Sequence, residues 1–218
     1  MNELPAGADA VLLDVGDTPR EIRRAERALR AACLSGALRG VTDIVPSATT
    51  ILVQFEFGFG ADSLGIQRVL RGAHRSDDAS PETTEDAIVV AVHYDGTDLA
   101  EVAHLLNLAP DEVISAHTGT PWRVQFMGFA PGFGYLVPED VPDNPLLRVP
   151  RRDEPRTRVP AGAVAIAAGY SAIYPRVSPG GWHLLGHTDI RLWDESATPP
   201  SLLTPGTLVR FRDVGDAP

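Results

Sequence analysis

The stretch Trp122-Arg-Val-Gln-Phe-Met-Gly-Phe-Ala-Pro-Gly-Phe-Gly-Tyr-Leu136 gives the clearest indication of the fold. It begins with a short run of β type, Trp122 to Met127, which glycines and a proline then interrupt. Further short runs of β type, separated by Gly and Pro turns, follow at 163–168, 183–185, 188–192 and 207–211. Many short strands with this punctuation predict a closed or sandwich-like β structure.

The same stretch is also a candidate binding loop, because glycines and a proline alternate with aromatic rings between Phe126 and Leu136. Glycine lets backbone N–H groups approach a ligand closely, and Pro131 stiffens the loop. In one interpretation Phe129, Phe133 and Tyr135 wall a small pocket. In the other the loop is a buried turn whose rings belong to the core. The residues alone leave both interpretations open.

The N-terminal part of the chain, 1–85, has a mixed α and β pattern. Strands are predicted at 10–15 and 49–57 and helices from Thr18 and over 61–71, and the order β-α-β-β-α favours a small split βαβ sandwich. Thr18, Pro19 and Glu21 form the N-cap, first turn and capping box of the first helix. Ile22, Ala25, Leu29 and Cys33 follow at helical spacing, so Cys33 is interpreted as a core residue.

A polar segment at 72–87 is predicted to be a linker or long loop. We therefore expect two domains, 1–86 and 87–218. The second opens with a strand at 88–94 and two helices near 98–106 and 110–117, which imitate a helix-turn-helix. Asp111 and Glu112 begin the second of these helices, which offers no Arg, and carboxylates there repel a nucleic-acid backbone. The expected structure is a helical hairpin that packs on a barrel.

Composition excludes several classes of function. The chain has 218 residues and a formal net charge of −10, whereas a nucleic-acid binder needs a basic footprint. All 19 basic residues are Arg, so P-loop, Schiff-base and Ser-Lys chemistry cannot come from this chain. The single cysteine rules out an intrachain disulfide and a thiolate metal cluster. The sequence shows no signal-peptide pattern and no run long enough to span a membrane, which makes a cytoplasmic location the expectation.

Two shorter motifs give weak signals. Gly58-Phe-Gly60 lies between a strand and a helix like a dinucleotide loop, but Ser63 stands where the third glycine belongs, so an ordinary tight turn is expected. His183 and His187 have the spacing of a helical metal pair, but glycines at 180, 181 and 186 argue against a helix. On a strand the two rings lie about 13 Å apart. No metal site is therefore expected.

The segment 147–160 holds the only dense positive cluster, namely Arg148, Arg151, Arg152, Arg156 and Arg158. Guanidinium forks match carboxylate or phosphate oxygens, which favours anion or substrate binding. The alternatives are local pairing with Asp153 and Glu154 or contact with a partner chain. A turn at 178–181 delivers Trp182, a candidate interface anchor. The candidate proton carriers are His93, His117 and His183, although a lone histidine is more often structural.

Taken together, these motifs resemble the allophanate hydrolase subunit 1 family, also known as the family of the B-type subunit of 5-oxoprolinase, which includes Kip-type sporulation-kinase inhibitors. The resemblance is strongest over 88–213 and extends, with weaker local signals, to 1–85. The matching stretches are Gly128–Phe133 with Tyr135 and Leu136, Pro150-Arg151, Pro155-Arg156, Val159–Gly162, Ile173–Pro175, Ser178–Trp182 and Leu203–Phe211.

The resemblance implies a fold of mixed α+β and mostly β type, in which a small α/β domain precedes a cyclophilin-like β-barrel. It implies a non-autonomous subunit of an ATP-dependent 5-oxoprolinase that cleaves 5-oxoproline to glutamate, with ATP bound at an unassigned site that a partner chain can share. A protein of the subunit 2 type, also called the C-type, is the implied partner, with a third subunit in the assembly. The alternative functions are inhibition of a histidine kinase and a carboxyltransferase-type module of the urea and allophanate pathway.

The candidate site residues follow from the loop, the Arg cluster and this resemblance. Substrate binding is expected at Gly128, Phe129, Pro131, Gly132, Phe133, Tyr135, Arg151, Arg156 and Tyr174. A partner interface is expected at Trp182 and Arg158, and His117 and His183 are the candidate catalytic residues. The family pattern Gly-Gly-x-Gln-Thr-Gly before Ile-Tyr-Pro is replaced here by 168–172, where Tyr170 stands in place of the glutamine. If that glutamine contacts substrate, the specificity of this chain differs.

Overall fold

The computed structural model describes residues 2–16, 18–75, 87–139, 141 and 143–215, and the chain divides into two compact units, 1–84 and 85–218. Most of the predicted linker, from 76 to 86, lies outside the described residues. Residues 72–75, its first part, instead belong to a helix. Among the described residues no helix is long and apolar enough to cross a membrane.

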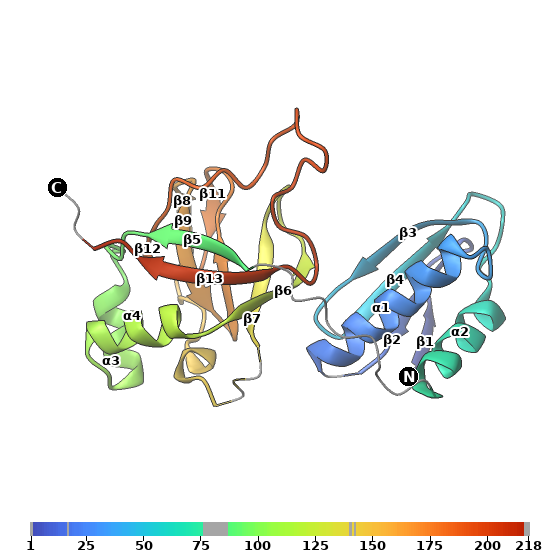
Figure 1. The fold of residues 1–218 in the computed structure, drawn as a ribbon, viewed down its shortest axis with the longest axis horizontal. Coiled ribbons are helices and arrows are strands. Elements are labelled where there is room, and N and C mark those ends of the chain that lie inside the picture. The colour runs from blue at the N-terminus through green and yellow to red at the C-terminus, as the bar shows by residue number, and fades with distance from the viewer. Residues whose placement is uncertain (1, 17, 76–86, 140, 142, 216–218) are drawn as a thin grey trace. The chain divides into compact units, whose positions relative to one another are not determined.

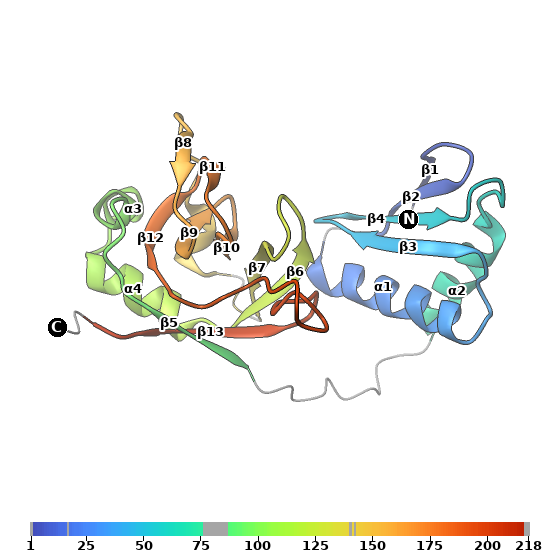
Figure 2. The same ribbon diagram turned by 90° about the horizontal axis from the view of Figure 1, so that it is seen from above.

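The first unit is a four-stranded antiparallel sheet with two helices (Figures 1 and 2). Its elements are β1 (Asn2–Pro5), β2 (Ala10–Asp14), α1 (Pro19–Leu34), β3 (Val41–Pro46), β4 (Thr50–Phe55) and α2 (Ser63–Arg75). The strand order is β1-β2-β4-β3. Because β4 is antiparallel to both β2 and β3, those two strands run parallel with β4 between them. This is the predicted split βαβ arrangement, with β1 as an unpredicted additional strand.

Helix α1 begins as its sequence predicts. The Thr18 side chain accepts a hydrogen bond from the Glu21 N–H, and the Glu21 carboxylate accepts one from the Thr18 N–H. Ile22 and Leu29 are buried against the sheet, and Cys33 packs beside them as a free thiol. The capping box fixes where the helix starts, and the apolar stripe fixes which face meets the strands.

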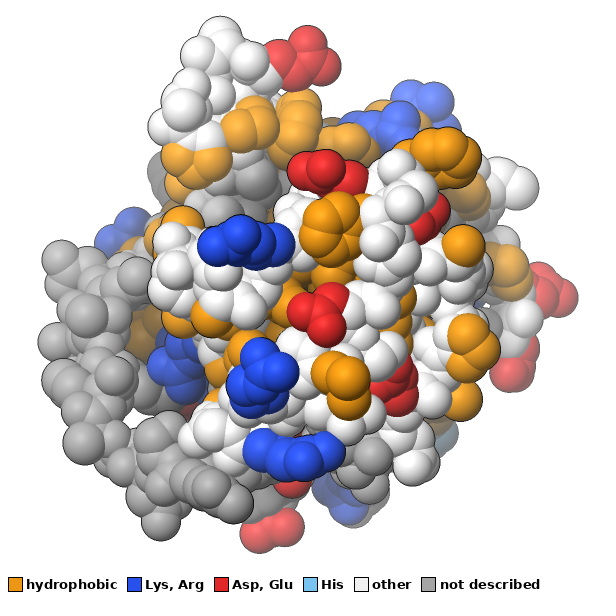
Figure 3. Space-filling model, turned by 90° about the vertical axis from the view of Figure 1, so that its right-hand side faces the viewer, with side chains coloured by type: hydrophobic (Ala, Val, Ile, Leu, Met, Phe, Trp, Pro, Cys, Tyr) orange, Lys and Arg blue, Asp and Glu red, His pale blue; other side chains and the backbone are white. Residues whose placement is uncertain are grey.

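The opposite face of this sheet carries a row of apolar residues. Leu4, Leu12, Leu52 and Val45 lie opposite one another across the four strands, and Leu4 and Val45 are exposed. The face of the molecule drawn in Figure 3 mixes Arg, acidic and hydrophobic side chains without a continuous patch of one kind.

The second unit is built on a nearly closed seven-stranded sheet of order β12-β9-β10-β7-β6-β13-β5. Its elements are β5 (Ile88–Val92), α3 (Leu99–Leu106), α4 (Pro110–Gly119), β6 (Trp122–Met127), β7 (Gly134–Pro138), the 3₁₀ turn η1 (Pro145–Arg148), β8 (Arg156–Val159), β9 (Ala163–Ala167), β10 (Tyr170–Ile173), β11 (Ser178–Gly180), β12 (His183–His187) and β13 (Leu208–Asp213). His93 and His187 exchange two backbone hydrogen bonds of 2.9 Å, which join the two ends of the sheet.

Some strands of this barrel unit differ from the prediction. The predicted strand at 188–192 is wrong, because the Thr188 side chain accepts a hydrogen bond from the Ile190 N–H and turns the chain out of the sheet. Strands β7, β8, β10 and β11 do not stand out in the sequence. Each of them has only three to five residues between turns. Such short strands are too short to show the alternation of apolar and polar residues by which a strand is recognised in a sequence.

The two helices after β5 form the expected hairpin on the barrel. Asn107 closes α3 in the left-handed conformation, with φ 56°. Helix α4 then lies against β13 and buries Val113 and His117, while α3 lies against β12. Figure 1 shows both helices beside the sheet. The apparent helix-turn-helix is therefore a covering layer of the barrel core.

Candidate functional site

The loop between β6 and β7 is a tight turn that its own backbone holds. The Gly128 N–H donates to the Phe133 carbonyl at 3.1 Å, and the Phe133 N–H donates to the Ala130 carbonyl at 2.9 Å. Phe129 and Gly132 both have positive φ, 63° and 81°. A side chain at Gly132 would meet the Leu192 carbonyl oxygen at 3.2 Å, so glycine allows this close approach.

Rings from this loop and from neighbouring strands and turns make one aromatic cluster, which consists of Phe126, Phe129, Phe133, Tyr135, Tyr170, Tyr174 and Trp182. The Phe126 and Tyr135 rings stack with centroids 4.3 Å apart. Tyr135 lies 5.6 Å from Tyr170 and 5.7 Å from Trp182, edge to face. The aromatic cluster therefore brings together segments that are far apart in the sequence.

The aromatic cluster has a buried side and an open side. Phe133, Tyr174 and Trp182 are buried, whereas Tyr135 and Tyr170 are partly exposed and Phe129 is 56% exposed. Some rings of the loop thus enter the core, as the buried-turn interpretation expects, and others remain accessible, while the binding pocket stays a prediction. Trp182 is only 5% exposed, so the structure places this predicted interface anchor in the core instead of on the surface.

The tyrosine hydroxyls of this cluster stay protonated at neutral pH. Burial raises the pKa of Tyr174 to about 12, and burial also raises the pKa values of Tyr135 and Tyr170. The positive charge of Arg151 opposes this rise of the pKa at Tyr135 and Tyr174. Neutral hydroxyls and an exposed guanidinium are hydrogen-bond donors, and they suit an anionic or carbonyl ligand.

Asp98 organises two other members of the Arg cluster. Its Oδ1 atom accepts hydrogen bonds from Arg156 Nη2 at 2.6 Å and Arg152 Nη1 at 3.0 Å, and its Oδ2 atom accepts one from the Leu184 N–H at 2.7 Å. Arg152 also pairs with Glu101 at 2.9 Å. The partners of these arginines thus come from the α3 region, in place of the local pairing with Asp153 and Glu154 that the sequence left open.

The Asp98 carboxyl stays ionised in these surroundings. Burial raises its pKa, but the hydrogen bonds from Arg156 and the Leu184 N–H, together with the two positive charges, outweigh burial and hold the pKa below its usual value. Sequence reasoning does not single out Asp98. Its position directly before α3 indicates only a helix start, because Arg152 and Arg156 are remote from it in the sequence.

His117 is buried in the core of the barrel unit. Its Nδ1 lies 2.6 Å from the Tyr94 hydroxyl and its Nε2 lies 2.8 Å from the Ser171 hydroxyl, so both ring nitrogens are hydrogen-bonded. Burial lowers its pKa to about 3, which keeps the ring neutral. These surroundings are those of a structural histidine.

His183 lies near α3. Its Nδ1 is 3.8 Å from Glu101 Oε2, and neither ring nitrogen meets hydrogen-bond geometry with a partner. Burial lowers its pKa, and the carboxylates of Glu101 and Asp98 oppose that shift. A bulge in β12 between Leu184 and Gly186 explains why His183 is buried while His187 is exposed. No group of three or more potential metal ligands occurs among the described residues.

The Gly58–Gly60 turn binds a side chain of its own unit. The N–H groups of Gly58 and Gly60 donate to the Asp9 carboxylate at 3.0 and 2.9 Å. These hydrogen bonds lower the pKa of Asp9. As expected, this glycine pair makes an ordinary turn, and its backbone N–H groups are hydrogen-bonded to Asp9.

Comparisons with known proteins identify the family. Residues 1–203 match the model of the carboxyltransferase domain, subdomain C and D. The chain belongs to this family. A relative from Escherichia coli O157:H7, named as the B-type subunit of 5-oxoprolinase, is 35% identical over 210 residues, which cover 94% of this chain and 92% of that protein. The relative of the same name from Bacillus subtilis is 41% identical over 116 residues, and the match spans about half of each protein.

Solved structures of similar proteins agree with the fold. The crystal structure of TTHA0988 is 35% identical with a TM-score of 0.77, and the match covers 97% of this chain but only 41% of that one. The Kluyveromyces lactis urea amidolyase has a TM-score of 0.69 at 19% identity, over 98% of this chain and 15% of that one, which shows a shared fold. The expected architecture of a small α/β unit followed by a barrel is thereby confirmed.

Proposed function

We propose that this chain is a non-autonomous subunit of an ATP-dependent 5-oxoprolinase and works with a C-type partner. The observation that carries the proposal is its near full-length match to the E. coli protein named as the B-type subunit of 5-oxoprolinase. The reaction opens the cyclic amide of 5-oxoproline to give glutamate and consumes ATP and water. ATP binds at a site on the companion subunits or shared with them.

The chemistry of 5-oxoproline fits the open side of the aromatic cluster. The substrate is a small ring with two methylene groups, one carboxylate and one amide. The partly exposed faces of Tyr135 and Tyr170 suit the methylene groups, and the Arg151 guanidinium suits the carboxylate. The protonated tyrosine hydroxyls supply donors for the amide oxygen. The chain therefore contributes positioning and electrostatic stabilisation.

The side chains of this chain support its dependence on companion subunits for ATP binding and proton transfer. The sequence contains no lysine to hold ATP phosphates. Of the two candidate catalytic histidines, His117 is hydrogen-bonded in the core and His183 is buried near α3. We therefore assign proton transfer and ATP activation to the companion subunits, while Asp98 fixes the orientation of Arg156 in this chain.

An omission experiment tests this proposal. The full chain is co-expressed with its genomic neighbours, the complex is purified through a tag on this chain, and 5-oxoproline-dependent ATP hydrolysis is measured. We expect activity from the complete complex and none when this chain or a companion is left out. Turnover by this chain alone would contradict non-autonomy. Capture of a histidine kinase without such activity would instead favour the inhibitor alternative.

A further inference from the structure

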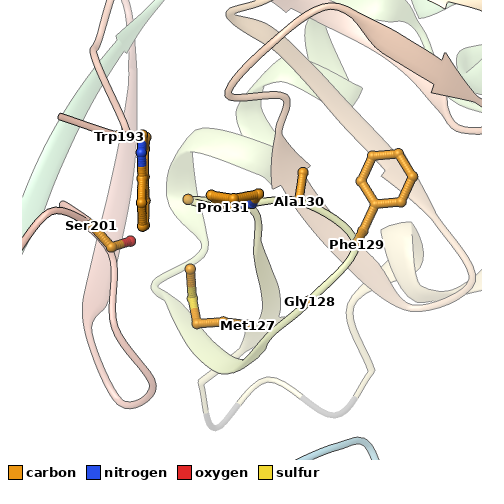
Figure 4. A pocket seen from close by; sticks show the side chains of 8 residues that line it. Met127, Gly128, Phe129, Ala130, Pro131, Trp193 and Ser201 are labelled. Carbon is orange, nitrogen blue, oxygen red and sulfur yellow. The ribbon is translucent and has the colours of Figure 1, made fainter. Parts of the chain in front are cut away.

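A hollow of about 470 Å³ lies between the β6–β7 loop and the segment that carries Trp193 and Ser201. Figure 4 shows the Trp193 indole opposite Pro131 and Met127. The lining of this hollow contains no charged residue and no histidine, so it offers neither an imidazole nor a carboxylate to a cation. Histidines with a carboxylate beside them lie instead at the seam of the barrel, where the chain after β5 meets the end of β12.

His93 and His187 form a directly opposed pair across this seam. Their backbones exchange two hydrogen bonds of 2.9 Å, and residues paired in this way project their side chains to the same face of the sheet. Gly186 lets the two segments come this close, because a Cβ atom there would collide with the His93 carbonyl oxygen. The two imidazole rings consequently lie next to each other, with centroids 5.0 Å apart and planes 17° from parallel.

Each of the two rings has its Nδ1 atom beside a hydrogen-bond acceptor. The His187 Nδ1 lies 2.8 Å from Asp95 Oδ1, and the His93 Nδ1 lies 3.2 Å from the Gly215 carbonyl oxygen. Because a carboxylate and a carbonyl can only accept, both Nδ1 atoms carry a proton and donate it. In the neutral ring Nε2 then keeps its lone pair. Among the described residues neither Nε2 atom has a hydrogen-bond partner.

This hydrogen bonding is typical of histidines that bind a metal ion. Such a histidine binds the ion through one ring nitrogen and donates its other N–H to a carboxylate or a backbone carbonyl, which fixes the tautomer and makes the ligand more basic. The Asp95 carboxylate supports His187 in this way, and the Gly215 carbonyl supports His93. The pair therefore presents two imidazoles in the tautomer that a metal ion requires.

The histidine pair is both held in place and accessible. The Val214 N–H donates to the Val92 carbonyl at 3.1 Å, which anchors the segment that carries Gly215. The side chain of His187 is 46% exposed and that of Asp95 is 58% exposed, so an ion reaches the pair without a change in the core. The formal net charge of −10 also favours the approach of a cation.

We propose that His93 and His187 bind a divalent cation of the zinc class through their Nε2 atoms. Imidazole suits zinc, copper and nickel, whereas Mg²⁺ and Ca²⁺ prefer oxygen ligands. A Zn–N bond is about 2.0–2.1 Å long, so two nitrogens on one ion lie at most about 4 Å apart. Rings with centroids 5.0 Å apart reach that spacing by a small side-chain rotation. Because no group of three potential ligands occurs among the described residues, water completes the coordination shell.

An ion bound by this pair would clamp the barrel shut. It would join the segment after β5 to the end of β12, which are the two ends of the seven-stranded sheet. A ligand that binds only the folded state stabilises that state by mass action. None of the residues involved belongs to the aromatic cluster or the Arg cluster, so this inference is independent of the proposed function.

The test titrates zinc chloride into the untagged full chain and measures binding by calorimetry. His93→Gln and His187→Gln each remove one imidazole, and His104→Gln, which removes an exposed histidine from α3, is the matched control. We expect each seam substitution to weaken zinc binding at least tenfold and the control to change it less than twofold. Asp95→Asn should weaken binding by a smaller factor, because it removes only the support of one ligand. Circular dichroism verifies folding.

Three calorimetric results would overturn the site. The first is no zinc binding by the wild type, and the second is equal zinc affinity in the wild type and both seam variants. The third is weaker binding in only one of the two seam variants, which would show a site with a single imidazole and refute the pair.

Two readouts on the wild-type chain do not depend on how the variants fold. In nitrogen NMR of the chain with labelled histidine, zinc should shift the Nε2 signals of His93 and His187, and shifts confined to other histidines would refute the pair. At a zinc concentration about 100 times the dissociation constant, the midpoint of thermal unfolding should rise by roughly 5–10 °C. An unchanged midpoint, or an equal rise with magnesium chloride, would overturn the clamp.

Discussion

One carboxylate oxygen of Asp98 holds two arginines, with Arg156 Nη2 at 2.6 Å and Arg152 Nη1 at 3.0 Å. The second oxygen of Asp98 binds the Leu184 N–H at 2.7 Å. Asp98 therefore connects the start of α3, the Arg cluster and β12. The orientation of the arginines depends on a residue that would not contact the substrate itself.

Removing the Asp98 carboxylate should destabilise the barrel unit strongly. Asp98→Ala leaves two partly buried cations without their shared anion, and breaking such a pair costs about 3–5 kcal/mol. Urea denaturation measures the change in the free energy of unfolding. Asp194→Ala, which removes a half-exposed carboxylate paired with Arg191 and hydrogen-bonded to Ser196, is the control and should have a much smaller effect. Equal effects of the two substitutions would contradict the assigned role of Asp98.

The contribution of Asp98 should depend on pH in a defined direction. Its folded-state pKa lies below the ordinary value of 3.8, so its stabilisation is present above pH 3.8 and is lost as the pH falls through the lower folded-state pKa. The difference in unfolding free energy between wild type and Asp98→Asn should accordingly shrink in this acidic range. If this difference in unfolding free energy stays constant from pH 7 to pH 2, the charge of Asp98 does not contribute to stability.

Burial of His117 predicts a second, separate pH effect. The pKa of this ring is about 3 in the folded protein and about 6.5 when unfolded, so below pH 6.5 the unfolded state binds a proton that the folded state does not. Its contribution to stability is thus complete above pH 6.5 and declines toward pH 3. His117→Gln should flatten the stability profile between these values. Thermal unfolding at several pH values measures this, and an unchanged slope would be the opposing result.

Gly180 makes room for the Tyr174 hydroxyl, which gives a prediction about the aromatic cluster. A Cβ atom at Gly180 would collide with that hydroxyl, so Gly180→Ala should displace Tyr174 and lower stability. Gly72→Ala on helix α2 is the matched control, because a Cβ there meets nothing within 4 Å and alanine favours helices by about 1 kcal/mol. Opposite signs of the two stability changes are expected, and a neutral Gly180→Ala would argue against close packing at Tyr174.

The fold is predictable from sequence where local signals agree. Thr18, Pro19 and Glu21 specify the start of α1, and the run 122–127 is strand β6 with the predicted bounds. Strand β10 escapes prediction because its four residues are too few to show a pattern. The strand predicted after His187 fails because the hydrogen bond from the Ile190 N–H to the Thr188 side chain, which turns the chain, competes with β propensity.

The candidate site is predicted from its motifs, and its residues stay a prediction. The loop, the Arg cluster and the family resemblance assign Tyr135, Tyr174 and Arg151 to one site. In the structure the Tyr135 and Tyr174 rings both lie against Phe133, with centroids 5.0 and 5.3 Å from it. The sequence cannot indicate Asp98, whose role exists only because the fold brings α3 to the Arg cluster. Nor can it show that Trp182 faces the core, because tryptophan is common both in cores and at interfaces.

The most direct test of the account is the response of the complete assembly to Arg151→Ala. Steady-state 5-oxoproline-dependent ATP hydrolysis is measured for the wild type, Arg151→Ala and, as control, Arg210→Ala, which removes an exposed guanidinium from β13. The account predicts that Arg151→Ala raises the KM for 5-oxoproline at least tenfold while the complex still assembles, and that Arg210→Ala leaves KM unchanged. An unchanged KM in Arg151→Ala would contradict a substrate site at the aromatic cluster.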